Sequence, residues 1–105
     1  MDKQYLYVSD DKSHVWSLDR RSSTSLWKQG VLNARVVTAP ASHDDYVVVG
    51  DLEGYLHWLS KVDGSLAART RLDDSAILAP PIVYDDILYS LSSDGTLAAY
   101  RVAGL

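Results

Sequence analysis

The sequence predicts an all-β fold in which short antiparallel strands are arranged in repeated units. The first observation is a repeat of 41 residues, which aligns Tyr5–Val8 with Tyr46–Val49 and Ile87–Ser90 without a gap. The second is that pairs such as Asp63-Gly64 separate the β-branched and aromatic runs, where tight hairpins need a positive φ. The third is that Tyr55–Leu59 carries bulky or apolar side chains on both alternating faces. The last pattern predicts small sheets that are covered on both sides.

A four-stranded unit of about 40 to 45 residues is the period of a β-propeller blade. We therefore predict a partial β-propeller of about two and a half four-stranded antiparallel blades. A three-layer sandwich is the alternative architecture. Because propellers close with about four to eight blades, we expect residues 1–105 to form a single domain within a longer propeller. The N-terminus of that parent would supply the missing final strand.

The three units follow one another along the chain. Residues 5–29 form a partial blade of three strands, which has no counterpart of the strand Val36–Ser42 that opens the next unit. Residues 36–72 form a full blade, with strands expected over Val36–Ser42, Tyr46–Gly50, Tyr55–Lys61 and Ser65–Leu72, and turns at His43–Asp45, Leu52–Gly54 and Val62–Gly64. Residues 77–101 form a partial blade without a fourth strand. The open edges are expected to meet the remaining blades of the parent or another chain.

Composition excludes several classes of protein. The 105 residues have a formal charge of -4 and no run of basic residues, so nucleic acid is not an expected partner. The absence of cysteine excludes a disulfide framework, a thiol nucleophile and Cys-ligated zinc. The apolar runs are far shorter than the ~20 residues that a membrane-spanning helix needs.

The polar residues that could carry chemistry do not form a recognised motif. His14 and His57 fall on expected strands and His43 in a turn, and none has a partner at metal-motif spacing. We expect His57 to pack between blades with its ring nitrogens hydrogen-bonded. Four Asp-Asp pairs are expected to lie in solvated turns, because neighbouring carboxylates there point apart. We therefore expect no catalytic, cofactor-binding or metal-binding residue.

One segment of the first unit fits a known repeat. Ser17–Asp19 followed by Ser22–Trp27 matches the spacing Ala-x-Asp-x-x-x-Gly-Lys-x-x-Trp, with identity at Asp19 and Trp27. This resembles the tryptophan-docking repeat of quinoprotein-like propellers, the PQQ-repeat family. The resemblance implies that the tryptophan packs against the neighbouring repeat and ties blades together. Ser23 stands in place of the glycine, and Ala68 stands where the second repeat would carry its tryptophan.

A longer stretch is more specific. Val47–Ser60, preceded by Thr38–Pro40 and followed by Asp63-Gly64, resembles the C-terminal blades of the BamB family of outer-membrane β-barrel assembly lipoproteins, and Leu91–Tyr100 suits the last repeat of that family. The resemblance covers nearly all of the chain. The residues that would carry the structural repeat are Asp19, Trp27, Gly54, Trp58, Gly64 and Gly95.

The resemblance implies a function as well as a fold. It implies an eight-bladed periplasmic propeller, lipid-anchored to the outer membrane, that acts as a non-enzymatic scaffold. Its partner would be the periplasmic domains of the central barrel-forming subunit, and no contact residue is transferred onto this chain. The alternative is part of a dehydrogenase propeller that depends on pyrroloquinoline quinone. That reading lacks the adjacent cysteines and the convergent acidic cluster that such enzymes place around quinone and calcium.

Overall fold

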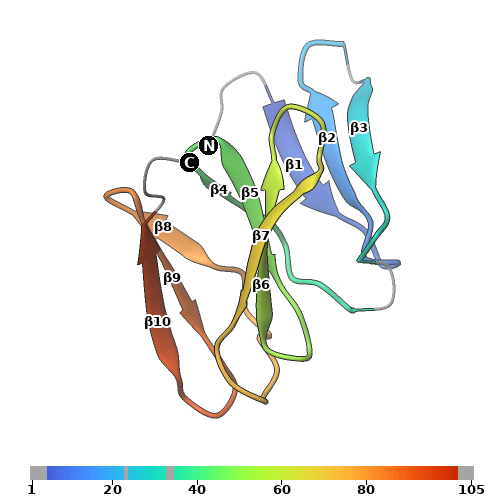
Figure 1. Ribbon diagram of the computed structural model, residues 1–105. Coiled ribbons are helices and arrows are strands. Elements are labelled where there is room, and N and C mark those ends of the chain that lie inside the picture. The colour runs from blue at the N-terminus through green and yellow to red at the C-terminus, as the bar shows by residue number, and fades with distance from the viewer. Residues whose placement is uncertain (1–4, 23, 33–34, 102–105) are drawn as a thin grey trace.

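The fold consists of three small antiparallel sheets that follow one another along the chain. Figure 1 shows the computed structural model, which describes residues 5–22, 24–32 and 35–101. Within these ranges the chain forms ten strands and no helix. None of the described residues therefore belongs to a helix long and apolar enough to cross a membrane.

The strands form sheets of three, four and three members. The first sheet has the order β1-β2-β3, with bounds Tyr5–Ser9, Val15–Asp19 and Ser25–Gln29. The second has the order β4-β5-β6-β7, with bounds Ala41–His43, Tyr46–Gly50, Tyr55–Ser60 and Leu66–Arg71. The third has the order β10-β9-β8, built from β8, β9 and β10 over Ile82–Tyr84, Ile87–Leu91 and Leu97–Arg101. The predicted all-β class and the predicted number of strands in each unit are confirmed.

The second sheet lies between the other two, and its two faces form two separate cores. Toward the first sheet, the buried residues are Val15, Leu32, Val47, Val49 and Leu59. Toward the third sheet, they are Val48, Leu56, Trp58, Ile77 and Leu88. The alternation of Val47, Val48 and Val49 between the two cores follows from the two-residue period of a strand. The prediction that both faces of this sheet are covered is confirmed.

The first and third sheets are each covered on one face only. Exposed apolar side chains remain at Leu6 in the first sheet and at Ile82, Tyr84, Leu91 and Leu97 in the third. Exposed apolar side chains gathered on the third sheet mark a place where a further layer can pack. This arrangement is that of consecutive blades within a propeller.

The opening strand of the second sheet is shorter than predicted. We expected a strand over Val36–Ser42, but β4 covers only Ala41–His43, and a single bridge pairs Val37 with Asp51. Val36 has a φ of 55°, which interrupts an extended strand, and Pro40 has no N–H to donate. His43, expected in a turn, instead closes β4 and is buried. The turn itself is formed by the following aspartates, with Asp44 at a φ of 56°.

The repeat extends to irregularities of the sheets. The pairing of β2 with β3 shifts register between Ser17 and Leu18, and the pairing of β6 with β7 shifts between Trp58 and Leu59. These two positions are related by the same repeat that aligns the strands. A β-bulge sharpens the local twist of a sheet. Each of these two sheets therefore bends its outer strand at the same point.

Candidate functional site

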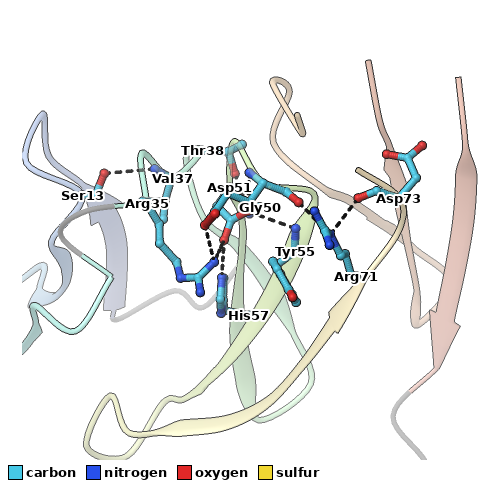
Figure 2. Close-up of polar contacts among 11 residues, drawn as sticks. Ser13, Arg35, Val37, Thr38, Gly50, Asp51, Tyr55, His57, Arg71 and Asp73 are labelled. Atoms are coloured by element: carbon cyan, nitrogen blue, oxygen red, sulfur yellow. Dashed lines mark hydrogen bonds and ion pairs between the residues drawn. The ribbon is translucent and has the colours of Figure 1, made fainter. Parts of the chain in front are cut away.

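The main polar site of the chain surrounds Asp51, which follows β5 and is fully buried (Figure 2). Its Oδ1 accepts hydrogen bonds from the backbone N–H groups of Glu53 at 2.9 Å and Tyr55 at 3.0 Å. Its Oδ2 lies 2.7 Å from Nε2 of His57 on β6 and 3.0 Å from a guanidinium nitrogen of Arg35. Arg35 belongs to the segment between the first and second sheets. One carboxylate therefore fastens a turn, a strand and an inter-sheet connection.

The electrostatics of this site keep the carboxylate charged and the imidazole neutral. Burial alone raises the pKa of Asp51, but hydrogen bonds from His57, from the Tyr55 N–H and from Arg35 outweigh it and leave that pKa below its ordinary value. Burial lowers the pKa of His57, and the neighbouring carboxylate opposes this only in part. A neutral imidazole has a single N–H, which His57 directs at Asp51.

We predicted that both ring nitrogens of His57 are hydrogen-bonded, and this prediction was wrong for Nδ1. Its Nδ1 is buried and has no hydrogen-bond partner among the described residues. The ring is only 1% exposed, and the tilted ring of Tyr55 lies 6.1 Å away between centroids. Packing of the two sheets encloses this nitrogen without offering it a donor.

The first sheet has the same arrangement of hydrogen bonds around Asp10. Its Oδ1 accepts from the N–H groups of Lys12 and His14, both at 3.0 Å, and its Oδ2 accepts from Nε1 of Trp16 at 2.9 Å. The Trp16 hydrogen bond is the main reason why the pKa of Asp10 falls to about 2. Trp16 thus fills the role that His57 has in the second sheet. Asp10 and Asp51 are 41 residues apart, so the repeat itself was the available signal for this site.

In the third sheet, two residues share the role that one aspartate has in the other sheets. Ser92 occupies the aligned position, and its hydroxyl oxygen accepts from the N–H of Thr96 at 3.0 Å. The same hydroxyl donates to Asp73 Oδ2 at 2.6 Å, and the hydroxyl of Ser75 donates to Asp73 Oδ1 at 2.6 Å. Hydrogen bonds from Ser75 and then Ser92 hold the pKa of Asp73 well below its usual range. A carboxylate from the connection between sheets therefore replaces one from the turn.

A tryptophan joins the first sheet to the second. Nε1 of Trp27 donates to the carbonyl oxygen of Lys61 at 2.9 Å, and the ring lies directly over Gly64. A Cβ at Gly64 would lie 2.7 Å from Cδ2 of Trp27, so only glycine leaves room for the ring. Nε2 of Gln29 adds a hydrogen bond to the Gly64 carbonyl at 2.9 Å. Trp27 therefore makes the inter-repeat contact that the resemblance implied.

A second tryptophan joins the second sheet to the third. Nε1 of Trp58 donates to Nδ1 of His43 at 3.3 Å, which leaves the proton of this neutral ring on Nε2. His43 Nε2 then donates to the carbonyl oxygen of Asp86 in the β8–β9 turn at 3.0 Å. The Trp58 ring meets the ring of Tyr100 edge-on, with centroids 5.4 Å apart. These hydrogen bonds were not predicted, because the turn pattern placed His43 in a turn.

The remaining predicted repeat residues lie at turns. The backbone N–H of Asp19 bonds to the Thr24 carbonyl at 2.9 Å, which closes the β2–β3 turn. Gly54 has a φ of 90°, and a Cβ there would lie 2.7 Å from the Ser75 carbonyl oxygen. Gly95 has a φ of 96° with nothing within 4 Å. The structure thus distributes the predicted residues over separate joints and turns and does not bring them into one cleft.

The histidines and acidic residues in the described part of the chain do not form a metal site. Groups of three or more His, Cys, Asp or Glu side chains that could hold a metal ion are absent from residues 5–22, 24–32 and 35–101. A cavity of about 280 Å³ lies where β1, β4 and β8 approach one another, and its walls are Leu6, Tyr7, Pro40, Ala41, Ser42 and Val83. These walls include no acid, base or cation. The geometry is that of contacts that hold sheets together.

Comparisons with known proteins place the chain among assembly factors. Residues 11–104 match a family model described as "Outer membrane protein assembly factor BamB". A protein of that name from Xanthomonas campestris is 46% identical over 96 residues, which are 91% of this chain and 24% of the relative. One from Pseudomonas aeruginosa is 41% identical over 97 residues, 92% of this chain and 26% of the relative. The chain therefore spans about a quarter of the length of these curated relatives.

Solved structures show the same fold. The crystal structure of BamB from Moraxella catarrhalis superimposes with a TM-score of 0.88 at 24% identity, covering 97% of this chain and 30% of that protein. The computationally designed protein Ika8 superimposes with a TM-score of 0.78 at 20% identity, covering 97% of this chain and 31% of the designed one. These likenesses support three consecutive blades of a propeller.

Proposed function

Because the chain belongs to the BamB family of outer membrane protein assembly factors, we propose that it forms part of a non-enzymatic scaffold for the assembly of outer-membrane β-barrel proteins. The match over residues 11–104 carries this proposal. The contacts that link neighbouring sheets support it, because a scaffold requires blades that keep a fixed orientation. Trp27 donates from the first sheet to the second, and His43 bonds from the second sheet to the third. Asp51 holds the segment that connects the first two sheets through Arg35.

The proposal includes the way in which the chain is divided. Residues 5–29, 36–72 and 77–101 would be successive blades of one propeller domain that includes all of residues 1–105. The residues proposed to maintain the structural repeat are Asp19, Trp27, Gly54, Trp58, Gly64 and Gly95. Ser23, which stands in place of the repeat glycine, lies outside the described residues.

The partner and the location are also proposals. The full-length protein would bind the periplasmic domains of the central barrel-forming subunit. It would work on the periplasmic face of the outer membrane, held there by a lipid anchor. The remaining blades of the same protein would cover the exposed apolar faces of the first and third sheets.

The dehydrogenase alternative is less well supported. Quinone-dependent propellers need acidic ligands for calcium and a surface that stacks on the quinone. The chain has no cysteine, and its described residues contain no cluster of three acidic or histidine side chains. The Asp-Asp pairs at Asp44 and Asp85 occupy exposed turns, as predicted. The described residues therefore lend no support to a site for pyrroloquinoline quinone.

The test captures the natural protein that contains these residues from gently solubilised cell envelopes through an affinity tag. We expect the central barrel-forming subunit to be recovered with it, and to be absent when the tag is expressed alone. A calorimetric titration of the same protein with pyrroloquinoline quinone and Ca²⁺ should give no saturable heat. Saturable binding of quinone together with loss of the barrel-forming subunit would overturn the scaffold proposal.

A further inference from the structure

Among the described residues, the outermost strand of the second sheet, β7, pairs with β6 only and so has a free edge. In the order β4-β5-β6-β7, β4 lies beside β8 of the third sheet, so β7 lies at the opposite end of its sheet. All six residues of β7 except Thr70 are exposed, and the strand contains neither proline nor glycine. Further propeller blades pack on the faces of sheets, so they leave this edge open. An open edge of this kind can accept an extended segment of another protein.

Two arginines contribute backbone groups to this edge. Leu72 N donates to the Gly54 carbonyl at 2.8 Å, which fixes the direction in which residues of β7 face β6. Arg71 pairs with Tyr55 in the same ladder. Because backbone groups alternate along an antiparallel ladder, those of Arg69 and Arg71 point away from β6. An incoming strand would therefore form its hydrogen bonds at these two residues.

The same two arginines belong to a concentration of positive charge. The guanidinium groups of Arg35, Arg69 and Arg71 each lie 5.1 Å from the ring centroid of Tyr55. Arg35 pairs with Asp51 and Glu53, and Arg71 lies 3.5 Å from Asp74.

The third arginine differs from the other two. Arg69 is exposed and forms no ion pair with any carboxylate in the described part of the chain. The chain as a whole is acidic, with a net charge of -4, whereas three arginines gather around Tyr55 beside this edge. A carboxylate on an incoming strand would supply the missing counter-charge of Arg69.

Small side chains leave room beside the edge. The repeat aligns Ala68 with Trp27, so the position that carries a docking tryptophan in the first sheet carries a methyl group in the second. Leu66, Ala67, Ala68 and Arg69 line a shallow cavity of about 280 Å³. Leu66 is 45% exposed at one end of it. An apolar side chain of the incoming segment would fill this space.

We propose that the free edge of β7 is a docking site for an extended acidic segment of a partner protein, which adds to the sheet and places a carboxylate beside Arg69. The backbone edge provides affinity, and the arginine selects for acidic residues at alternate positions. This inference goes beyond the proposed scaffold role, because it does not depend on the identity of the barrel-forming subunit. Binding to that subunit can fail or succeed independently of the peptide test below.

The test measures binding of a synthetic peptide, acetyl-Thr-Glu-Val-Glu-Val-Thr-amide, to the natural protein that contains these residues. We expect Arg69→Glu to weaken binding about fivefold, the effect of a lost cross-strand ion pair. The same variant should prefer a peptide in which lysine replaces glutamate. Arg21→Glu, at an exposed turn of the first sheet, is the matched control and should leave both affinities unchanged. Circular dichroism checks that each variant is folded.

N-methylated peptides separate strand addition from simple attraction of charges. Methyl groups on one alternate set of amides should abolish binding, and methyl groups on the other set should be tolerated. Equal binding of both methylated peptides, or an Arg69→Glu variant with unchanged affinity, would overturn the proposal. Sedimentation of the protein alone tests the other occupant. A dimer that Arg69→Glu dissociates would show that a second copy of the chain, and not an acidic partner, occupies the edge.

Discussion

The contact between Trp27 and Gly64 can be tested by adding a single methyl group. Gly64 has a φ of 77°, where an L-residue costs about 1–2 kcal/mol. In Gly64→Ala the new Cβ would also lie 2.7 Å from Cδ2 and 2.8 Å from Cζ3 of Trp27. Displacing a packed ring in this way costs about 1–3 kcal/mol more. We therefore expect Gly64→Ala to lower the free energy of unfolding by about 2–5 kcal/mol in urea titrations followed by circular dichroism.

Gly95 provides the matched control for this variant. Its φ of 96° also disfavours an L-residue, but nothing lies within 4 Å of a Cβ there. Gly95→Ala should therefore show only the backbone effect of about 1–2 kcal/mol. In a Trp27→Ala background, Gly64→Ala should fall to the same value, because the clash is gone. Equal effects of Gly64→Ala and Gly95→Ala in the parent chain would refute the assigned role of the Trp27 contact.

Three further perturbations test the other joints. Asp51→Asn should lower the free energy of unfolding by about 1–3 kcal/mol in urea titrations, because a buried carboxylate that accepts from Arg35 and His57 loses its charge; no loss would contradict the proposed contact. The lowered pKa of His57 means that the unfolded chain binds a proton more readily than the folded one as pH falls below about 6.5. Stability should thus be fully present above that pH and decline below it, and His57→Gln should remove this decline in pH-dependent thermal melts. Trp58→Phe should cost about 1–3 kcal/mol by the same titration, because Nδ1 of His43 loses its buried donor, and an unchanged midpoint would rule out this hydrogen bond.

The sequence was sufficient to predict how many strands each sheet has and which turns connect them. Strand alternation and the repeat identify neighbours within a ladder, because both depend on residues close in the chain or related by a fixed offset. Turn glycines such as Gly54 and Gly64 were identifiable because a tight hairpin requires a positive φ, which both adopt at 90° and 77°. The backbone conformation of Val36 was not identifiable, since nothing in a β-branched residue indicates a φ of 55°.

The contacts between sheets were less accessible from sequence. Arg35 reaches Asp51 across 16 residues, Trp27 reaches Lys61 across 34, and His43 reaches Asp86 across 43. None of these contacts follows from strand periodicity, because each depends on how one twisted sheet is oriented on the next. Only the contact of Trp27 was predicted, because its segment resembles a docking repeat. The polar joint at Asp51 is visible in the sequence only as an aspartate that recurs at the position of Asp10.

Because the second sheet is covered on both faces, the described sheets should exchange their amide protons at different rates. Val47 and Val49 pack toward the first sheet and Val48 toward the third, and all three are fully buried. Their amides are released only when both neighbouring sheets have separated, so they should be the slowest to exchange with deuterium. Strands β3 and β10 each end a sheet that has one uncovered face, so their amides should exchange first. Unfolding would then proceed from the two terminal sheets toward the second, as expected for an array stabilised by nearest neighbours.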